Sequence, residues 1–495
     1  MKRFNLLLLS LFIPLFFFAQ NMASLLEAEW SKTQHSLNMN GQKLNYSVTT
    51  GYMPMTDDSG KLQAKVFFIA YTKDNIEDAS KRPITYTFNG GPGSSSVWLH
   101  MGGLGPKRIL MSDKGAALPP PYEVVDNPYT WLDKTDLVFI DPMMTGYTRP
   151  AEGIDKKDFL GYEEDIRLVG DFIRLFTTKM ERWNSPKFLA GESYGTTRAA
   201  GLSGYLQDQY GLYLNGVILI SAVLDFSTIR DFEYNDVPHP LRLPSFAATS
   251  WYHKKTDPKH TNLRIFLDEV EKFAVEEYSV ALLKGARLEQ SEKEKIMNKL
   301  HEYTGLSKTY LEDTNLRLYV GKYNKELLRD QSETVGRLDA RFKSSDYNDI
   351  GERYEFDPSY NGAIYGPFTM AINDHIRRTL KYKNDLPYEI LTGKARPWNY
   401  SNVQNRFLNV SETLRQAMNK NPYLKVWIAS GYYDLATPYF ASEYVVDHMF
   451  LKEKLRKNVT MTYYESGHMM YIHKPSLLQL KKDFDSFMES SLNHK

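Results

Sequence analysis

The sequence predicts an α/β fold in which a mostly parallel central sheet is flanked by helices and interrupted by a largely helical insertion. Three observations support this prediction. Up to residue 225, short apolar stretches rich in β-branched and aromatic residues alternate with helical segments, which is typical of parallel strands joined by helices. From 226 to 397, long helical segments dominate. From 398 to 495, the alternation of strand and helix returns.

Strands and helices alternate along the first part of the predicted core, residues 20–225. The stretch DLVFIDP at 136–142 is almost continuously apolar, as expected for a strand buried on both faces. In 163–180, apolar side chains recur at spacings of three and four residues, which predicts a helix with one buried face. In chain order, we expect strands at 65–72, 83–90 and 136–142, a helix at 163–180, a strand at 187–190, a helix at 196–209 and a strand at 216–223.

The insertion, residues 226–397, contains long helical stretches at 262–285 and 291–305 and no clear pattern of a buried strand. We expect it to cap a cleft in the core and to set selectivity there. The second part of the core, residues 398–495, resumes the earlier alternation. In it we expect a helix at 409–419, a strand at 424–430, a helix after Pro438, a strand at 459–465 and a last helix from Pro475.

Composition excludes several kinds of function. The 495 residues include no cysteine, so the chain has neither a thiol nucleophile nor a zinc–thiolate site. The formal net charge of +1 provides no overall field that would select nucleic acid or an anionic membrane. Charged residues at 24% and hydrophobic residues at 42% are typical of a globular protein.

The N-terminal residues predict export. Lys2 and Arg3 precede an apolar stretch at 6–18 and the small residue Ala19, which is the pattern of a signal peptide at 1–19. An uncleaved anchor is the alternative, although a 13-residue apolar stretch is short for a membrane span. We expect no stable membrane span after cleavage and a periplasmic or extracellular location. A long exported chain without cysteine fits a bacterial source better than a eukaryotic one.

The motif GESYG at 191–195 predicts a serine nucleophile. It matches G-x-S-x-G and lies between the expected strand at 187–190 and the expected helix at 196–209. A sharp turn there holds the Ser193 hydroxyl out at the end of the sheet, and the flanking glycines leave room for the turn. The helix N-terminus also brings free N–H groups near the oxygen that becomes negative. The alternative is a serine in an ordinary glycine-rich turn.

A serine nucleophile needs a base and an acidic residue that orients the base. Asp434 follows the expected strand at 424–430, and His468 follows the strand at 459–465, so both are expected at the carboxyl ends of strands. The order Ser, Asp, His is the one that this strand–turn–helix architecture uses. His473 is the nearest rival to His468 as the base.

The glycine-rich loop NGGPGSSS at 89–96 predicts part of an oxyanion hole. It follows the expected strand at 83–90, and paired glycines let backbone N–H groups come close to a substrate oxygen. One donor is expected from this loop and one from Tyr194, the residue after the nucleophile. A phosphate-binding loop is the alternative, but it requires G-x-x-x-x-G-K-[ST], and this loop has no lysine.

Together these motifs resemble those of the serine carboxypeptidase family. The matching stretches, in the family's order, are NGGPGSS at 89–95, GESYG at 191–195, GYYDLATP at 431–438 and GHM at 467–469. The resemblance implies an α/β-hydrolase fold with a helical cap insertion. It also implies peptide substrates with a free C-terminus and neither a metal nor an organic cofactor.

The resemblance assigns further roles. Asn89 and Glu192 would bind the substrate's C-terminal carboxylate, and the N–H groups of Gly91 and Tyr194 would bind the oxyanion. Glu192 must be protonated for this, because two anions in contact repel each other. The preference of such enzymes for acidic pH follows from this requirement.

The sequence therefore predicts an exported serine carboxypeptidase that acts through Ser193, His468 and Asp434. An esterase or acyltransferase with the same triad is the alternative, and an inactive binding protein is a third possibility. The chain departs from the family pattern at Ser94, where Cys is usual, and at Thr87, where Trp is usual. We expect Thr87 to weaken carboxylate recognition. The sequence leaves the oligomeric state and the preferred terminal residue open.

Overall fold

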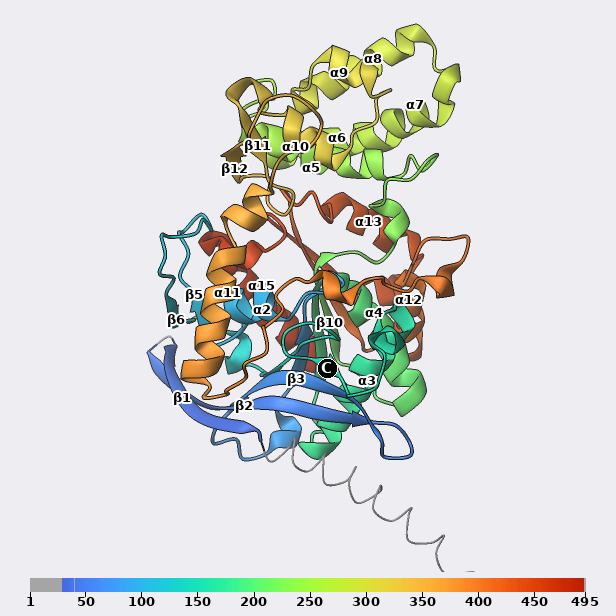
Figure 1. Ribbon diagram of the computed structural model, residues 1–495. Coiled ribbons are helices and arrows are strands. Elements are labelled where there is room, and N and C mark those ends of the chain that lie inside the picture. The colour runs from blue at the N-terminus through green and yellow to red at the C-terminus, as the bar shows by residue number, and fades with distance from the viewer. Residues whose placement is uncertain (1–28, 40, 494–495) are drawn as a thin grey trace, which may run out of the picture.

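The computed structural model describes residues 29–39 and 41–493, which form two lobes (Figure 1). The larger lobe contains a central sheet, and the smaller lobe stands over one end of it. The expected signal peptide, residues 1–19, lies outside the described residues. None of the described helices is both long enough and apolar enough to cross a membrane.

The larger lobe is organised around a sheet with the strand order β1-β2-β3-β7-β4-β9-β10-β13-β14, in which β8 also pairs with β3. Neighbouring strands from β7 to β14 run parallel, whereas β1, β2, β3 and β7 pair in antiparallel fashion. The predicted mostly parallel sheet is therefore confirmed. Its strands are β1 (Ser31–Met39), β2 (Gln42–Thr56), β3 (Leu62–Lys73), β4 (Ile84–Phe88), β7 (Asp136–Ile140), β8 (Arg149–Pro150), β9 (Lys187–Ser193), β10 (Gly216–Ala222), β13 (Lys425–Gly431) and β14 (Val459–Tyr464).

Strands β1 and β2 are absent from the sequence prediction. Gly51 and Pro54 lie inside β2, and both residue types are depleted in strands, so they obscure its pattern. Gly51 is required by packing, because a Cβ there would lie 2.5 Å from the Trp30 ring. Pro54 pairs with Lys65 of β3, and the long antiparallel pairing of these strands extends the sheet beyond its parallel part.

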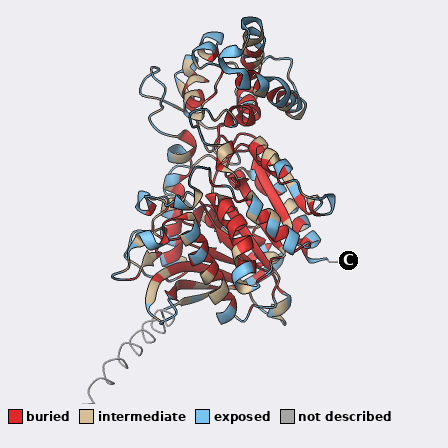
Figure 2. Cartoon of the chain, turned by 90° about the vertical axis from the view of Figure 1, so that its right-hand side faces the viewer, coloured by how far each residue is buried: buried red, intermediate tan, exposed pale blue. Residues whose placement is uncertain are grey.

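Helices cover both faces of the sheet. Phe68 of β3 belongs to a buried cluster with residues of α3, α4 and α12, whereas its neighbour Phe67 belongs to a second cluster with residues of α11 and α15. Side chains alternate along a strand, so both faces are buried. Figure 2 shows this buried interior running through the larger lobe. The flanking helices are α3 (Tyr162–Lys179), α4 (Tyr194–Tyr210), α11 (Tyr365–Asp374), α12 (Ser411–Lys420), α13 (Tyr439–His448) and α15 (Lys474–Leu492).

The smaller lobe is formed by part of the predicted insertion, and its hydrophobic core continues onto Tyr433 and Tyr439 of the larger lobe. That core includes Phe266, Tyr303 and Leu311. A short hairpin, β11–β12, accompanies the expected helices. The elements are α5 (Pro238–Tyr252), α6 (Leu263–Phe273), α7 (Ser279–Lys284), α8 (Gln290–Thr304), α9 (Lys308–Asp313), α10 (Val320–Glu326), β11 (Glu333–Val335) and β12 (Lys343–Ser345).

The end of the predicted insertion returns to the larger lobe. Phe368 of α11 packs on Trp98 with ring centroids 5.1 Å apart, and Tyr388 packs on Tyr147 at the same distance. The division into a core and an insertion at 226–397 stays a prediction, but the packing of α11 onto the sheet differs from that of a cap helix. Short elements complete the fold: α2 (Val97–Leu99), β5 (Lys107–Ile109), β6 (Val124–Asp126) and α14 (Glu453–Arg456).

Candidate active site

Ser193 occupies a strained turn between β9 and α4. Its backbone has φ +59° and ψ −129°, in a region that residues with a side chain rarely adopt. The turn requires glycine on both sides, because a Cβ on Gly191 would lie 2.1 Å from the carbonyl oxygen of Gly195. A Cβ on Gly195 would lie 2.7 Å from the carbonyl oxygen of Phe88. The predicted nucleophile thus stands where the sheet ends and the helix begins.

Asp434 and His468 are joined by a hydrogen bond at the carboxyl ends of β13 and β14. The distance between Asp434 Oδ2 and His468 Nδ1 is 2.7 Å. Asp434 is fully buried, and its Oδ1 accepts from the N–H groups of Ala436 and Thr437 at 2.8 and 3.0 Å. The Thr437 hydroxyl donates to Oδ2 at 2.7 Å. These bonds hold the Asp434 carboxylate against Nδ1 of the His468 ring. The other ring nitrogen, His468 Nε2, stays free of Asp434, and His468 lines the cavity.

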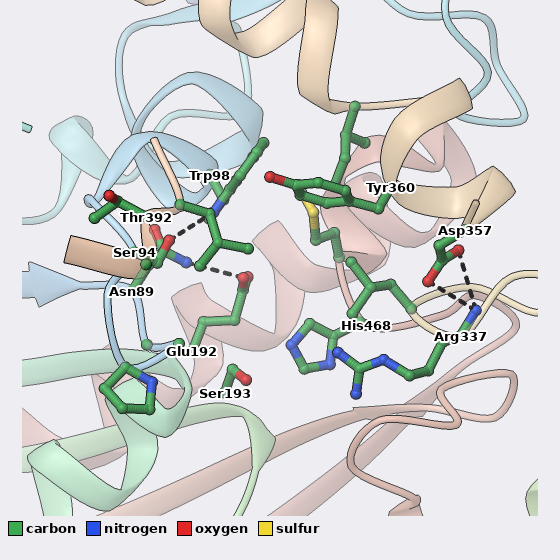
Figure 3. Close-up of a pocket in the computed structure, with 18 of the residues that line it drawn as sticks. Asn89, Ser94, Trp98, Glu192, Ser193, Arg337, Asp357, Tyr360, Thr392 and His468 are labelled. Carbon is green, nitrogen blue, oxygen red and sulfur yellow. Dashed lines mark hydrogen bonds between the residues drawn. The ribbon is translucent and has the colours of Figure 1, made fainter. Parts of the chain in front are cut away.

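The surroundings of His468 favour its cation. Burial by itself would lower the pKa of His468, but the charge of Asp434 and the hydrogen bond to it outweigh burial, so the pKa is raised above its ordinary value. A base that accepts a proton during a reaction requires this stabilisation. Within the described residues, the Ser193 hydroxyl makes no hydrogen bond to His468, but both side chains line the same cavity (Figure 3). Such contacts commonly tighten when substrate binds.

Two backbone N–H groups beside Ser193 are available to a substrate oxygen. Tyr194 is the first residue of α4, so its N–H has no acceptor within the helix. Gly91 has φ +103°, and within the described residues its N–H has no acceptor either. A Cβ on the neighbouring Gly90 would lie 2.4 Å from the Tyr194 nitrogen, so only glycine permits this approach. The geometry is that expected of an oxyanion hole.

Asn89 and Glu192 form a buried pair next to Ser193. Asn89 Nδ2 donates to Glu192 Oε1 at 2.9 Å, and the Tyr471 hydroxyl donates to Glu192 Oε2. The exposed fraction is 1% for Asn89 and 2% for Glu192. Asn89 is fixed in turn, because its Oδ1 accepts from the N–H of Leu99 at 3.1 Å. The structure therefore brings together the two residues that the resemblance assigned to one role.

Burial raises the pKa of Glu192 to about 7. The charge on His468 and the hydrogen bonds from Tyr471 and Asn89 oppose this shift but do not cancel it. Glu192 therefore carries a proton below pH 7. Both of its oxygens already accept hydrogen bonds, so that proton is available to a group in the cavity.

A buried ion pair supports the backbone of this pair from beneath. The Arg198 guanidinium binds Asp165 at 2.7 Å and donates to the carbonyl oxygen of Asn89 at 2.6 Å. The side chains of Arg198 and Asp165 are 0% and 1% exposed. A fully buried ion pair makes the orientation of Asn89 costly to change.

Asn89, Glu192, Ser193 and His468 line a cavity with a volume of about 600 Å³. This size is in the range of pockets that bind small ligands. Loops of the larger lobe and residues 337–396 both contribute to its wall (Figure 3). Its apolar and aromatic lining includes Trp98, Tyr360 and Met469. The cavity is therefore shaped jointly by the core loops and by the predicted insertion.

The smaller lobe contacts the loop that carries His468. The His468 N–H donates to the carbonyl oxygen of Leu338 at 2.6 Å, and the Gly467 N–H donates to Asp339 at 3.1 Å. Asp339 also forms a buried ion pair with Arg341 at 2.6 Å. This contact fixes His468 from a segment more than a hundred residues away in sequence.

The sequence also singled out His473, as the rival base, and Thr87, as a departure from the family pattern. His473 caps the start of α15 and bonds to Ser476 at 2.8 Å, and burial lowers its pKa to about 4. Thr87 is a buried residue of β4 whose hydroxyl has no hydrogen-bond partner among the described residues. Across the described part of the chain, no cluster of three His, Asp or Glu residues is arranged to hold a metal ion.

Sequence reasoning missed Tyr471, Thr437 and Arg337. Thr437 lies inside the aspartate motif, three residues after Asp434. A threonine at this spacing is a local sequence signal, because it can donate hydrogen bonds to the carboxylate. Tyr471 and Arg337 reach the site through the packing of distant segments, and no local pattern indicates their contacts.

A family model for serine carboxypeptidases matches residues 39–479. The chain belongs to the serine carboxypeptidase family. The resemblance deduced from the motifs is thereby confirmed. The fold agrees with the crystal structure of a Saccharomyces cerevisiae prohormone-processing carboxypeptidase, Kex1Δp, with a TM-score of 0.56, 17% identity, and coverage of 90% of this chain and 91% of that one. The expected α/β-hydrolase fold is confirmed with it.

Curated relatives match over shorter stretches. Carboxypeptidase Y of Saccharomyces cerevisiae is 29% identical over 155 residues, which is 30% of this chain and 25% of that protein. Serine carboxypeptidase-like 37 of Arabidopsis thaliana is 27% identical over 149 residues, which is 29% of this chain and 28% of that protein. The matched stretches thus span well under half of these relatives' length.

Proposed function

We propose that this protein is a serine carboxypeptidase that removes the last residue of a peptide through an acyl-enzyme. The observation that carries the proposal is the buried Asn89–Glu192 pair directly beside Ser193. Asn89, Glu192 and Ser193 line the same cavity, so the pair and the nucleophile face the same bound substrate. A carboxylate bound at the pair therefore presents the last peptide bond to the serine.

The chemistry then follows from the hydrogen bonds. Ser193 Oγ attacks the carbonyl carbon while His468 Nε2 accepts the hydroxyl proton, and Asp434 stabilises the imidazolium that forms. The N–H groups of Gly91 and Tyr194 stabilise the negative oxygen. His468 returns its proton to the departing amino acid. Water activated by the same histidine hydrolyses the acyl-enzyme.

A protonated Glu192 donates a hydrogen bond to the substrate carboxylate. The pKa of about 7 means that this proton is present in acid and lost above neutrality. We therefore propose that peptide cleavage is favoured at acidic pH. An esterase would gain nothing from such a carboxylate site, so this feature favours the carboxypeptidase over the esterase or acyltransferase.

Replacement of Asn89 tests the proposal. Asn89→Ala removes a donor to Glu192 and to the substrate carboxylate, so kcat/KM for an N-blocked peptide should fall about tenfold or more. A small ester has no terminal carboxylate, and its hydrolysis should fall much less. Labelling of Ser193 by a fluorophosphonate reports that the site is intact. Equal losses for peptide and ester would contradict the assignment.

We also propose that the protein is exported and that its signal peptide is removed after Ala19. The basic and apolar N-terminal pattern supports this. N-terminal sequencing of the protein from the native cells should begin after residue 19. A chain that retains Met1 and fractionates with membranes would support an uncleaved anchor instead.

A further inference from the structure

Among the described residues, the guanidinium of Arg337 has no hydrogen-bond or ion-pair partner. Arg337 follows β11 in the smaller lobe and lines the cavity together with Ser193 and His468. Its side chain points toward His468 (Figure 3).

The backbone of Arg337, in contrast, is held from both sides. Its N–H donates to Asp357 at 3.2 Å, and its carbonyl oxygen accepts from the N–H of Leu435 at 3.1 Å. The next residue, Leu338, accepts from the N–H of His468. Asp357 is occupied by backbone N–H groups and by the Ser359 hydroxyl rather than by the guanidinium. The arginine is thus placed firmly. Its guanidinium makes no hydrogen bond or ion pair with the described residues, although its charge acts to lower the pKa of His468 and of Tyr354.

The position of Arg337 fits one part of a bound peptide. In Figure 3 the Asn89–Glu192 pair lies on one side of Ser193, and Arg337 approaches from the other. A carboxylate bound at the pair places the last residue of the substrate between the pair and the serine. The peptide then continues past Ser193 toward Arg337, and consecutive residues advance by at most about 3.3–3.6 Å. The residue before the cleaved bond is therefore the one that meets the guanidinium.

We propose that Arg337 binds an acidic side chain at the penultimate position of the substrate, so that the enzyme prefers peptides ending in Glu-X or Asp-X. This inference rests on the proposed carboxypeptidase activity. A guanidinium binds a carboxylate through two parallel hydrogen bonds, which makes arginine well suited to such a site.

The charges around the cavity agree with this preference. Glu192 is neutral in the state that binds substrate, and the Asp357 carboxylate accepts from the N–H of Arg337 and from Ser359. Arg396 contributes a second cation, from the segment that runs along Gly93. The cavity lining therefore includes two guanidinium groups and one carboxylate, that of Asp357, whose oxygens are already engaged.

The test uses three N-blocked peptides that share a C-terminal leucine and carry Glu, Gln or Leu before it. At about pH 6 the substrate glutamate is ionised, since its ordinary pKa is about 4.3. The wild-type kcat/KM should be about tenfold higher for the Glu peptide than for the Gln peptide, which is the gain expected from one charge-assisted hydrogen bond. In Arg337→Met this ratio should fall to about one, and Arg337→Lys should keep part of it. The wild-type ratio should also disappear below about pH 4, when the substrate carboxyl is protonated.

Arg396→Met serves as the matched control, because it removes a cation that another segment contributes to the same cavity. It should keep a Glu-to-Gln ratio well above one. A ratio that collapses in Arg396→Met but not in Arg337→Met would overturn the assignment, as would a wild-type ratio near one. If wild-type enzyme cleaved none of the peptides yet still reacted with a fluorophosphonate, the proposed carboxypeptidase activity would fail first.

Discussion

Replacing Glu192 by glutamine should remove the alkaline loss of peptide cleavage. Glu192 can bind a substrate carboxylate only while it holds a proton, and burial raises its pKa to about 7. A glutamine amide donates a hydrogen bond at every pH. It can still accept from Asn89, and the Tyr471 hydroxyl can accept from it in turn. The variant should therefore bind the carboxylate without regard to pH.

The expected magnitude follows from the pKa. With a pKa of about 7, about nine-tenths of the wild-type molecules hold the Glu192 proton at pH 6, but only about one-hundredth hold it at pH 9. Peptide cleavage should therefore fall about ninetyfold across this interval because of Glu192 alone. Above neutrality, the loss approaches tenfold for each pH unit.

The assay compares an N-blocked peptide with a small neutral ester from about pH 5 to 9 in both proteins. Both reactions need neutral His468, so the titration of this base cancels in the ratio of their kcat/KM values. In wild-type enzyme the peptide-to-ester ratio should fall above about pH 7, and in Glu192→Gln it should stay flat. A flat wild-type ratio, or an alkaline fall that persists in the variant, would refute the reasoning.

Three further substitutions test other contacts. Ser193→Ala should lower peptide kcat/KM about 10⁴- to 10⁶-fold and abolish fluorophosphonate labelling, and labelling at another residue would contradict the assignment. Gly90→Ala places a Cβ 2.4 Å from the Tyr194 nitrogen, so kcat for peptide and ester should both fall about a hundredfold in steady-state assays; a near wild-type kcat would exclude this amide as a donor. Arg341→Met leaves Asp339 buried without its cation and should lower the free energy of unfolding by about 3 kcal/mol in a urea titration, whereas a change below about 0.5 kcal/mol would show that the pair contributes little.

Local patterns predicted the residues whose roles are set by the chain around them. The turn at Ser193 needs a glycine on each side for steric reasons, and the same glycines make the motif visible in the sequence. Asp434 and His468 each follow a buried strand, and parallel strands bring their carboxyl ends to the same edge. The pair Asn89–Glu192 was assigned by resemblance, and the structure joins these side chains at 2.9 Å.

Contacts between distant segments could not be predicted in the same way. Tyr471 donates to Glu192 across 279 residues of sequence, and Leu338 accepts from the N–H of His468 across 130. Neither contact leaves a periodic or compositional trace, because each depends on how whole elements pack. That the Arg337 guanidinium has no partner within the described part of the chain can be seen only once its neighbours are known.

The same limit applies to the packing of α11 and to strand β2. Helix α11 has an ordinary helical sequence, so its pattern does not distinguish packing on the smaller lobe from packing on the sheet; Phe368 and its contact with Trp98 decide this. Strand β2 was not predicted because Gly51 and Pro54, two residue types that are depleted in strands, interrupt its pattern. Gly51 is set by its packing against Trp30, a contact that the local pattern does not show.

Mass spectrometry of an N-blocked peptide incubated with the wild-type protein and with Ser193→Ala tests carboxypeptidase activity most directly. We predict loss of single residues from the C-terminus, slowing above about pH 7 as Glu192 loses its proton, and no loss with the variant. An amidated copy of the peptide, which has no terminal carboxylate, should be cleaved far more slowly. Cleavage within the chain, or equal cleavage of both copies, would contradict the role of Asn89 and Glu192. An intact peptide together with rapid ester hydrolysis would contradict carboxypeptidase activity itself.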